Sequence, residues 1–274
     1  AASGRLGMTP SAVSQKIRQL ESQLGVRLFE RTSRSVRLTE AGQTLLEDTE
    51  RAFTELGDAL DRVRAIGRAP AGELRINLSR LAAQACILPR LADFIRHYPD
   101  IALELATDDR LSDIVAGGFH AGIRMSDSLE MDMISRPVGP PLHARVLASA
   151  KYLEQMGVPQ HPCDLAGHRL IRYRFPGSQR LKPLVFNVNG RLQEMSVQAA
   201  MVFNDNDHIA YAVREGLGIA QGFWPDEDEA IERGELVEVL SAFAPPPSQF
   251  HLYYPSREQP PKLKAFIDWF CRPW

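Results

Sequence analysis

The stretch TPSAVSQKIRQLESQLG, residues 9–25, has the pattern of a helix with two different faces. Its apolar residues recur at steps of three and four, which is typical of a helix that packs against a core. These residues are Val13, Ile17, Leu20 and Leu24. The other face is polar and carries no acid between Ser11 and Arg18. A solvated face usually mixes both signs of charge, so we interpret this one as a surface for phosphates and base edges; an ordinary surface helix is the alternative.

Both ends of this helix are marked in the sequence. Thr9 can cap the first turn, Pro10 suits the first position and Gly25 suits a left-handed end. Residues 1–7 have the pattern of the tail of a preceding helix that ends at Gly7. Two helices joined by so short a turn form a helix-turn-helix.

Residues 26–42, VRLFERTSRSVRLTEAG, predict two short strands around a polar turn at 32–35, as in a wing. Arginines line this wing at Arg31, Arg34 and Arg37. Residues 1–38 hold seven basic and two acidic side chains, so this segment carries +5 in a chain of net charge −2, and the remainder carries −7. A basic end on an acidic body indicates contact with a polyanion; a solvated basic hairpin is the alternative.

A long helix is predicted over residues 39–66, with one apolar seam along it. The seam consists of Leu45, Thr49, Phe53, Leu56, Leu60 and Val63. Such a repeat favours pairing with a second helix, and Phe53, Leu56 and Leu60 are the expected dimer contacts. A core helix within one chain is the alternative. Residues 67–72, GRAPAG, break the pattern and act as a linker.

From residue 73 onward, strands alternate with helices, which predicts an α/β fold with a largely parallel sheet. In the first part we expect strands at 74–79, 101–107 and 120–125, and helices at 88–99 and 111–118. After a crossover at 143–149 we expect strands at 168–174, 184–190, 197–205, 219–225 and 250–256, and helices at 207–218, 226–236 and 260–272. The last helix should turn Leu263, Phe266, Ile267 and Phe270 inward. Two α/β lobes of this kind leave a ligand cleft between them.

Composition fits a protein of two or three compact units, because 274 residues exceed the usual size of one domain. No apolar run is long enough to span a membrane, and no secretion signal is visible. The three cysteines, Cys86, Cys163 and Cys271, are odd in number and far apart, which favours a reducing cytosol over a disulfide framework.

Several motifs favour structural interpretations over chemical ones. The glycines of GLGIAQG, residues 216–222, end a helix and start a strand, which is the reverse of a dinucleotide-binding loop, so we expect a cap and close packing. Cys86 lies among apolar residues and is expected in the core. The seven histidines show no metal-ligand spacing, and no nucleophile elbow, Walker loop or zincin helix is present, so we expect no metal, no cofactor and no enzyme.

Residues 6–46, LGMTPSAVSQKIRQLESQLGVRLFERTSRSVRLTEAGQTLL, resemble the winged helix-turn-helix of LysR-type transcriptional regulators without a gap. The later segments AGIRM, DLAGHRLI and FHLYYPSREQ with LKAFIDW resemble the CrgA-like subgroup. The resemblance implies an all-α winged helix-turn-helix over 1–38, lacking most of its first helix, and a linker and dimerisation helix with a hinge over 39–72. It implies over 73–274 an effector domain of two α/β lobes that resembles type 2 periplasmic binding proteins.

The resemblance also implies DNA contacts. The family places the N-terminal part of the second helix in the major groove, and the matching residues are Pro10, Ser11, Ser14, Gln15 and Arg18. The wing residues Arg31, Arg34 and Arg37 would hold the backbone or enter the minor groove, with Arg34 at the tip. Pairing of the long helices would set two recognition helices on one face of double-stranded DNA.

The effector positions follow from the same resemblance. They are Ser79, Arg80, Leu81, Arg124, Ser126, Asn204, Asp205, Gly222 and Phe223. A hydroxyl, backbone N–H groups and arginines suit an acidic ligand, such as a carboxylate, with Phe223 against its apolar part. The alternative is that Arg80 faces solvent or pairs with Asp109 or Asp205, which leaves a polar but neutral pocket.

We therefore expect a cytoplasmic, sequence-specific DNA-binding transcriptional regulator whose effector shifts its population of conformations. The expected partners are DNA, a small-molecule effector and a second copy, with a homotetramer and RNA polymerase as further candidates. Two other classes are weighed against it. A solute-binding module would not need the basic N-terminal segment, and an enzyme on this fold would need paired catalytic groups that the sequence lacks.

Overall fold

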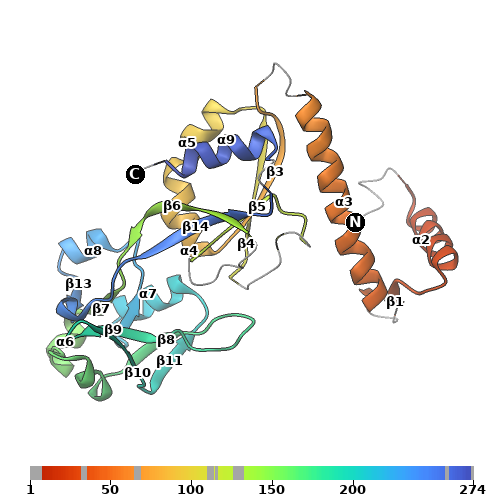
Figure 1. The fold of residues 1–274 in the computed structure, drawn as a ribbon. Helices are drawn as coiled ribbons and strands as arrows, with labels where there is room; N and C mark the ends of the chain where they lie inside the picture. The colour runs from red at the N-terminus through yellow and green to blue at the C-terminus, as the bar shows by residue number, and fades with distance from the viewer. Residues whose placement is uncertain are drawn as a thin grey trace. The chain divides into compact units, whose positions relative to one another are not determined.

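The computed structural model describes residues 8–31, 36–64, 69–109, 114, 117–125, 133–256 and 259–272. The chain forms two compact units, residues 1–60 with 115–118 and residues 61–114 with 119–274 (Figure 1). No described helix combines the length and the apolar character that crossing a membrane requires.

The first unit contains a helix, a two-stranded wing and a long second helix. Its elements are α2 (Pro10–Leu24), β1 (Phe29–Arg31), β2 (Val36–Leu38) and α3 (Glu40–Arg64), with β1 and β2 antiparallel. The predicted ends of α2 are confirmed, because the Ala12 N–H donates to Oγ1 of Thr9 (3.3 Å) and Gly25 has a φ of +70°. The helix, wing strands and long helix therefore follow the predicted order.

Polar contacts join these elements. The carboxylate of Glu21 in α2 accepts hydrogen bonds from the N–H groups of Leu28 (2.9 Å) and Phe29 (3.1 Å). The Thr39 hydroxyl donates to the Arg27 carbonyl (2.6 Å) and accepts from the Gly42 N–H (3.0 Å), so it caps α3. The wing is thus anchored at its base to both helices.

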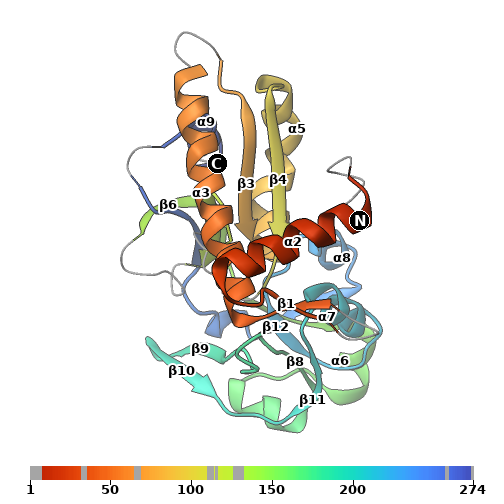
Figure 2. The ribbon, with the colours of Figure 1, turned by 90° about the vertical axis from the view of Figure 1, so that its right-hand side faces the viewer.

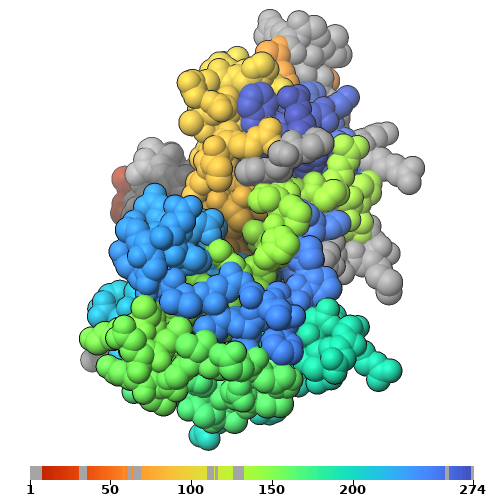
Figure 3. Space-filling model, turned by 90° about the vertical axis from the view of Figure 1, so that its left-hand side faces the viewer, coloured from red at the N-terminus to blue at the C-terminus, as the bar shows by residue number. Residues whose placement is uncertain are grey.

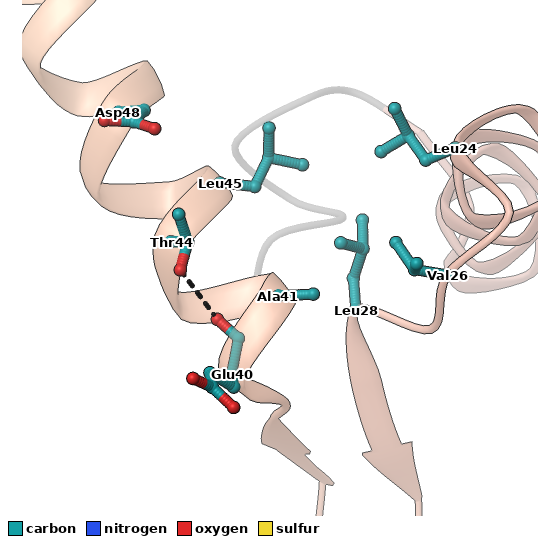
Figure 4. Close-up of a pocket in the computed structure, with 8 residues that line it drawn as sticks. All are labelled: Leu24, Val26, Leu28, Glu40, Ala41, Thr44, Leu45 and Asp48. Atoms are coloured by element: carbon teal, nitrogen blue, oxygen red, sulfur yellow. Dashed lines mark hydrogen bonds between the residues drawn. The ribbon is translucent and has the colours of Figure 1, made fainter.

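The residues that the structure describes leave the apolar stripe of α2 without a buried member, and Leu20 and Leu24 are exposed. An open pocket of about 500 Å³ lies where the end of α2 faces the start of α3 (Figure 4). Its walls are Leu24, Val26, Leu28, Ala41, Thr44 and Leu45, with Glu40 and Asp48 also lining it. The predicted preceding helix at 1–7 lies outside the described residues.

The second unit begins with a five-stranded sheet of order β4-β3-β5-β14-β6, here called the first lobe with its helices. The strands are β3 (Gly72–Leu78), β4 (Ile101–Thr107), β5 (Ala121–Met125), β6 (Ile134–Leu142) and β14 (Ser248–Tyr254). β3 is parallel to β4 and β5, whereas β14 is antiparallel to β5 and β6. Of the predicted helix at 111–118, the structure describes residues 114, 117 and 118.

One face of this sheet carries the core of the first lobe. It is covered by a continuous helical segment and by the last helix (Figures 2 and 3). Their packing buries Leu74, Ile76, Phe94 and Phe266. The segment consists of α4 (Arg80–Ala82), a π-helical turn (Ala83–Ile87) and α5 (Leu88–His97); the last helix is α9 (Pro261–Phe270). The inward residues predicted for the last helix are all buried, and so is Cys86.

The second lobe is built from shorter elements. Its strands are β7 (Arg145–Ser149), β8 (Leu170–Tyr173), β9 (Leu184–Val188), β10 (Arg191–Met195), β11 (Ala199–Phe203), β12 (Ala220–Gly222) and β13 (Leu236–Val239). Its helices are α6 (Ala150–Met156), α7 (Asn206–Arg214), α8 (Asp228–Glu232) and two 3-10 turns (Pro162–Gly167 and Ser241–Phe243). β8 and β11 are parallel, β9 and β10 form a hairpin, and β7 lies between β12 and β13.

The glycines of residues 216–222 have the structural role that the sequence suggests. Gly216 has a φ of +72° after α7, a conformation that L side chains rarely adopt. A Cβ on Gly218 would lie only 2.2 Å from the carbonyl oxygen of Arg169, and one on Gly222 would lie 3.1 Å from the Trp224 ring. Close backbone packing, rather than nucleotide binding, accounts for these glycines.

Replacement of Gly218 by alanine should destabilise the chain by about 1–3 kcal/mol, because the backbone of residue 169 would have to move away from the new methyl group. Chemical unfolding monitored by circular dichroism measures this effect. Gly167→Ala is the matched control, because a Cβ there meets nothing within 4 Å. Equal stability of the two variants would contradict the packing argument.

Candidate nucleic-acid interface and inter-lobe site

The N-terminal half of α2 presents a polar, acid-free face. Ser11, Gln15 and Arg18 are exposed, Ser14 is half-buried, and the first turn holds no acid. The Arg18 Nε donates to the carbonyl of Ser14 (3.3 Å), which holds that side chain along the helix. Pro10 is exposed at the helix start, where unpaired N–H groups and the helix dipole attract anions. The predicted recognition residues that the structure describes therefore share one accessible surface.

The wing is described only in part. Arg37 is exposed on β2 and lies opposite Glu30 of β1 in the ladder. Arg34 and the side chain of Arg31 lie outside the described residues. The structure therefore describes the side chain of one of the three predicted wing arginines, Arg37.

The predicted seam of α3 is half-buried at Leu45 and Thr49 and exposed from Phe53 onward. Phe53 is 73% exposed, and Leu56, Leu60 and Val63 are also exposed. Leaving such large apolar side chains in water is unfavourable, and a row of them along one helix is typical of an interaction surface. The residues that the structure describes do not bury Phe53, Leu56, Leu60 or Val63.

Four of the predicted effector residues lie around the junction of the two lobes of the second unit. Ser79 follows β3 and caps the next helical segment, since its Oγ accepts from the Ala82 N–H (3.1 Å). Leu81 packs against the core of the first lobe. The Arg80 guanidinium reaches across to the carboxylate of Asp205 in the second lobe and forms an ion pair with it.

Asp109 makes a second connection between the lobes. Its Oδ1 accepts from the backbone N–H of Arg80 (3.0 Å), and its Oδ2 accepts from the Tyr173 hydroxyl (3.5 Å). Burial of the tyrosine, followed by the charge of Asp109 and the hydrogen bond to it, raises the pKa of the Tyr173 hydroxyl. The hydroxyl therefore stays protonated and donates. Sequence reasoning missed Tyr173, although its position at the end of a predicted strand was a usable signal.

Asp205 caps α7 and joins the lobes at the same time. Its Oδ1 accepts from the N–H groups of Asp207 (2.9 Å) and His208 (3.4 Å), while its Oδ2 pairs with Arg80. The pairing of Arg80 with Asp205 is the alternative that the sequence left open beside an acidic ligand. In this structure, Arg80 is thus occupied by the protein's own carboxylate.

Arg124 has a different position from the one expected of a ligand contact. Only 5% of this residue is exposed, and its guanidinium donates to the carbonyls of Ile123 (2.9 Å) and Asp108 (3.0 Å) and to Asn77. Burial lowers the pKa of the guanidinium. Its hydrogen bonds join the ends of three neighbouring strands, which favours a structural role over direct ligand contact.

The remaining predicted effector residues are spread out. The Phe223 ring lies 4.1 Å from Nζ of Lys182, a cation–π contact that the sequence did not suggest. Gly222 is packed beside Trp224, Asn204 is exposed, and Ser126 lies outside the described residues.

In the described part of the chain, no group of three His, Cys, Asp or Glu side chains could hold a metal ion. Burial raises the pKa of the Cys86 thiol to about 12 and that of Cys271 to about 11. Reactive cysteines have lowered pKa values, so these two thiols are of the unreactive, structural kind.

Comparisons with known proteins agree with this arrangement. A model of the LysR substrate binding domain matches residues 67–272, and a model of the bacterial regulatory helix-turn-helix protein of the lysR family matches residues 1–43. The HTH-type transcriptional regulator YcaN of Escherichia coli (strain K12), described as uncharacterized, is 40% identical over 270 residues, which cover 98% of this chain and 88% of that protein.

Solved structures extend the comparison to the whole fold. Full-length AphB of Vibrio cholerae, a virulence activator, superposes with a TM-score of 0.69 at 25% identity over 97% of this chain and 91% of that one. CrgA of Neisseria meningitidis, a LysR-type transcriptional regulator, gives a TM-score of 0.66 at 25% identity over 98% and 91%. The chain belongs to the LysR family of transcriptional regulators, which join a DNA-binding helix-turn-helix to a domain that binds a small-molecule effector.

Proposed function

We propose that the N-terminal half of α2 reads the operator, with Ser14 and Gln15 on base edges and Pro10, Ser11 and Arg18 at the groove walls. The observation that carries this proposal is the exposed, acid-free polar face at a capped helix start. Serine and glutamine side chains donate and accept hydrogen bonds, as base edges in the major groove require, and Arg18 suits a phosphate or a guanine.

The wing arginines supply the electrostatic part of binding in this proposal. Arg31, Arg34 and Arg37 neutralise phosphates on either side of the recognition helix, and Arg34 is the candidate for the minor groove. They belong to the +5 segment at residues 1–38, while the rest of the chain is acidic.

The regulator pairs through the exposed seam of α3, within the linker region 39–72. Phe53, Leu56 and Leu60 lie at the centre of this contact and are exposed in the single chain. A dimer presents two recognition helices to a two-fold operator, and a tetramer repeats the arrangement. It acts on DNA in the cytoplasm as a regulator rather than an enzyme, and RNA polymerase is the partner through which it would alter transcription.

The effector lies between the two lobes of the second unit and carries an anionic group, such as a carboxylate. Arg80, at the lobe junction, is the cation that would bind it, and Phe223 is the residue proposed to pack on its apolar part. An effector that binds one lobe arrangement better than another shifts the population toward it, and so alters the protein on DNA.

The recognition assignment predicts that Gln15→Ala and Ser14→Ala relax sequence preference. Each lost base contact should cost about 1–3 kcal/mol at the cognate site and little on random DNA. Fluorescence anisotropy at fixed salt with both DNAs measures the difference. Gln23→Ala, an exposed glutamine at the other end of α2, is the matched control. Equal losses on both DNAs would rule out base contact by these residues.

The seam assignment predicts that Leu56→Glu separates the protomers, because an unpaired carboxylate in an apolar contact is costly to desolvate. Sedimentation velocity should show a smaller species, while circular dichroism stays unchanged. Arg51→Glu places a carboxylate on the far side of the same helix, about half a turn away, and should leave the assembly intact. A Leu56→Glu protein that sediments like the parent would exclude this seam.

The effector assignment predicts that some small carboxylate raises the melting temperature of the parent and that Arg80→Ala abolishes the shift, because a ligand stabilises only the state that it binds. Arg96→Ala is the control, since this exposed arginine of the first lobe pairs with Asp93 on its own helix. A thermal-shift screen checks both variants. Stabilisation confined to neutral or cationic compounds would contradict an anionic effector.

A further inference from the structure

Two aspartates at the lobe junction share one arrangement. Each uses one carboxylate oxygen within its own lobe and the other oxygen across the junction. Asp109 accepts from the Arg80 N–H in its own lobe and from the Tyr173 hydroxyl of the second lobe. Asp205 accepts from the first N–H groups of α7 in its own lobe and pairs with the Arg80 side chain of the first lobe. The lobes are therefore joined by carboxylates that local structure already holds in position.

The groups that donate hydrogen bonds to the carboxylates of Asp109 and Asp205 are of the kind that binds an anionic ligand. The guanidinium of Arg80, its backbone N–H and the Tyr173 hydroxyl are all donors. The acceptors that they meet in these contacts are Asp109 and Asp205. The junction thus has the donor set of an anion site, with side-chain carboxylates of the chain in the place of a ligand.

We propose that Asp205 is an intramolecular competitor of the effector, which occupies Arg80 with its Oδ2 until an anionic group of the ligand replaces it. The proposal rests on the proposed function, in which the effector enters between the lobes. Binding is then an exchange of one carboxylate for another on the same guanidinium. The apparent affinity for the effector is reduced by the fraction of molecules in which Asp205 holds Arg80.

The ion pair of Arg80 with Asp205 is weak enough for a ligand to replace it. The side chain of Arg80 is 51% exposed and that of Asp205 is 15% exposed. Ion pairs with this much solvent contribute little to stability, so a ligand with several contacts can replace one. The cap on α7 uses the other oxygen of Asp205, so it persists when Arg80 leaves. The two lobes can therefore separate from each other without unfolding a helix.

Asp205→Asn isolates the competing charge. Asparagine caps a helix as well as aspartate does, so α7 stays capped while the ion pair is lost. Asp207→Asn is the matched control, because it removes an exposed acid from the first turn of the same helix. Arg80→Gln removes the shared cation. The parent and these three variants are used as full chains.

The probe is phenylacetate, with phenylacetamide as its neutral counterpart, titrated by isothermal calorimetry. Asp205→Asn should bind phenylacetate about fivefold or more tightly than the parent, which is the lower end of typical coupling between two sites. Asp207→Asn should match the parent, Arg80→Gln should lose binding, and phenylacetamide should show no gain. Unchanged affinity in Asp205→Asn, or an equal gain in Asp207→Asn, would overturn the competitor role.

A ligand-free measurement tests the same contact independently. Asp205→Asn and Arg80→Gln should each lower the melting temperature slightly, and the double variant should fall no further than either alone, because both remove one interaction. Additive losses would overturn the proposal. Binding in the parent that Asp205→Asn does not strengthen overturns the competitor role alone. The anionic effector is tested separately by the carboxylate screen, and it fails if no carboxylate stabilises the parent.

Discussion

Burial of one face of the five-stranded sheet is the constraint on which the second unit depends. The alternating apolar residues of β3 and β5 meet the helical segment 80–97 and α9, so the strands cannot slip by one residue without exposing the core. With this register fixed, the carboxyl ends of parallel strands meet at one edge. Arg80 and Asp109 follow two of those ends, which explains why residues 29 positions apart share a hydrogen bond.

The fold was predictable from the sequence wherever a segment was long and periodic. The helix caps at Thr9 and Gly25, the core strands and the inward face of α9 follow from local pattern alone. The misses were short or irregular elements. β6 contains prolines and glycine, β10 is exposed along most of its length, and β13 has four residues, so none has enough alternation to be recognised. The π-helical turn likewise leaves no period in the sequence.

For the effector site, the sequence predicted which positions lie near the lobe junction but not the contacts that their side chains make. Resemblance indicated which turns face the lobe junction, but it could not tell that Arg124 is buried among strand ends while Arg80 is accessible. That difference depends on the direction in which each side chain points from the end of its strand. It also depends on contacts between segments that are distant in the chain. The contact of Arg80 with Asp205 spans 125 positions, and the cation–π pair of Lys182 with Phe223 joins residues from two distant parts of the chain, so neither has a local signature.

The π-helical turn at Ala83–Ile87 lies between Arg80 and the buried face of α5. Such a turn is equivalent to one residue inserted into an α-helix. Loss of one residue from it would yield a regular helix with the core contacts of α5 intact, but it would rotate everything before it by about 100°. The direction of the Arg80 side chain at the lobe junction is therefore set by the length of this segment as well as by the identity of its residues. In relatives that have one residue fewer or more in this segment, the residue at that position would point in a different direction.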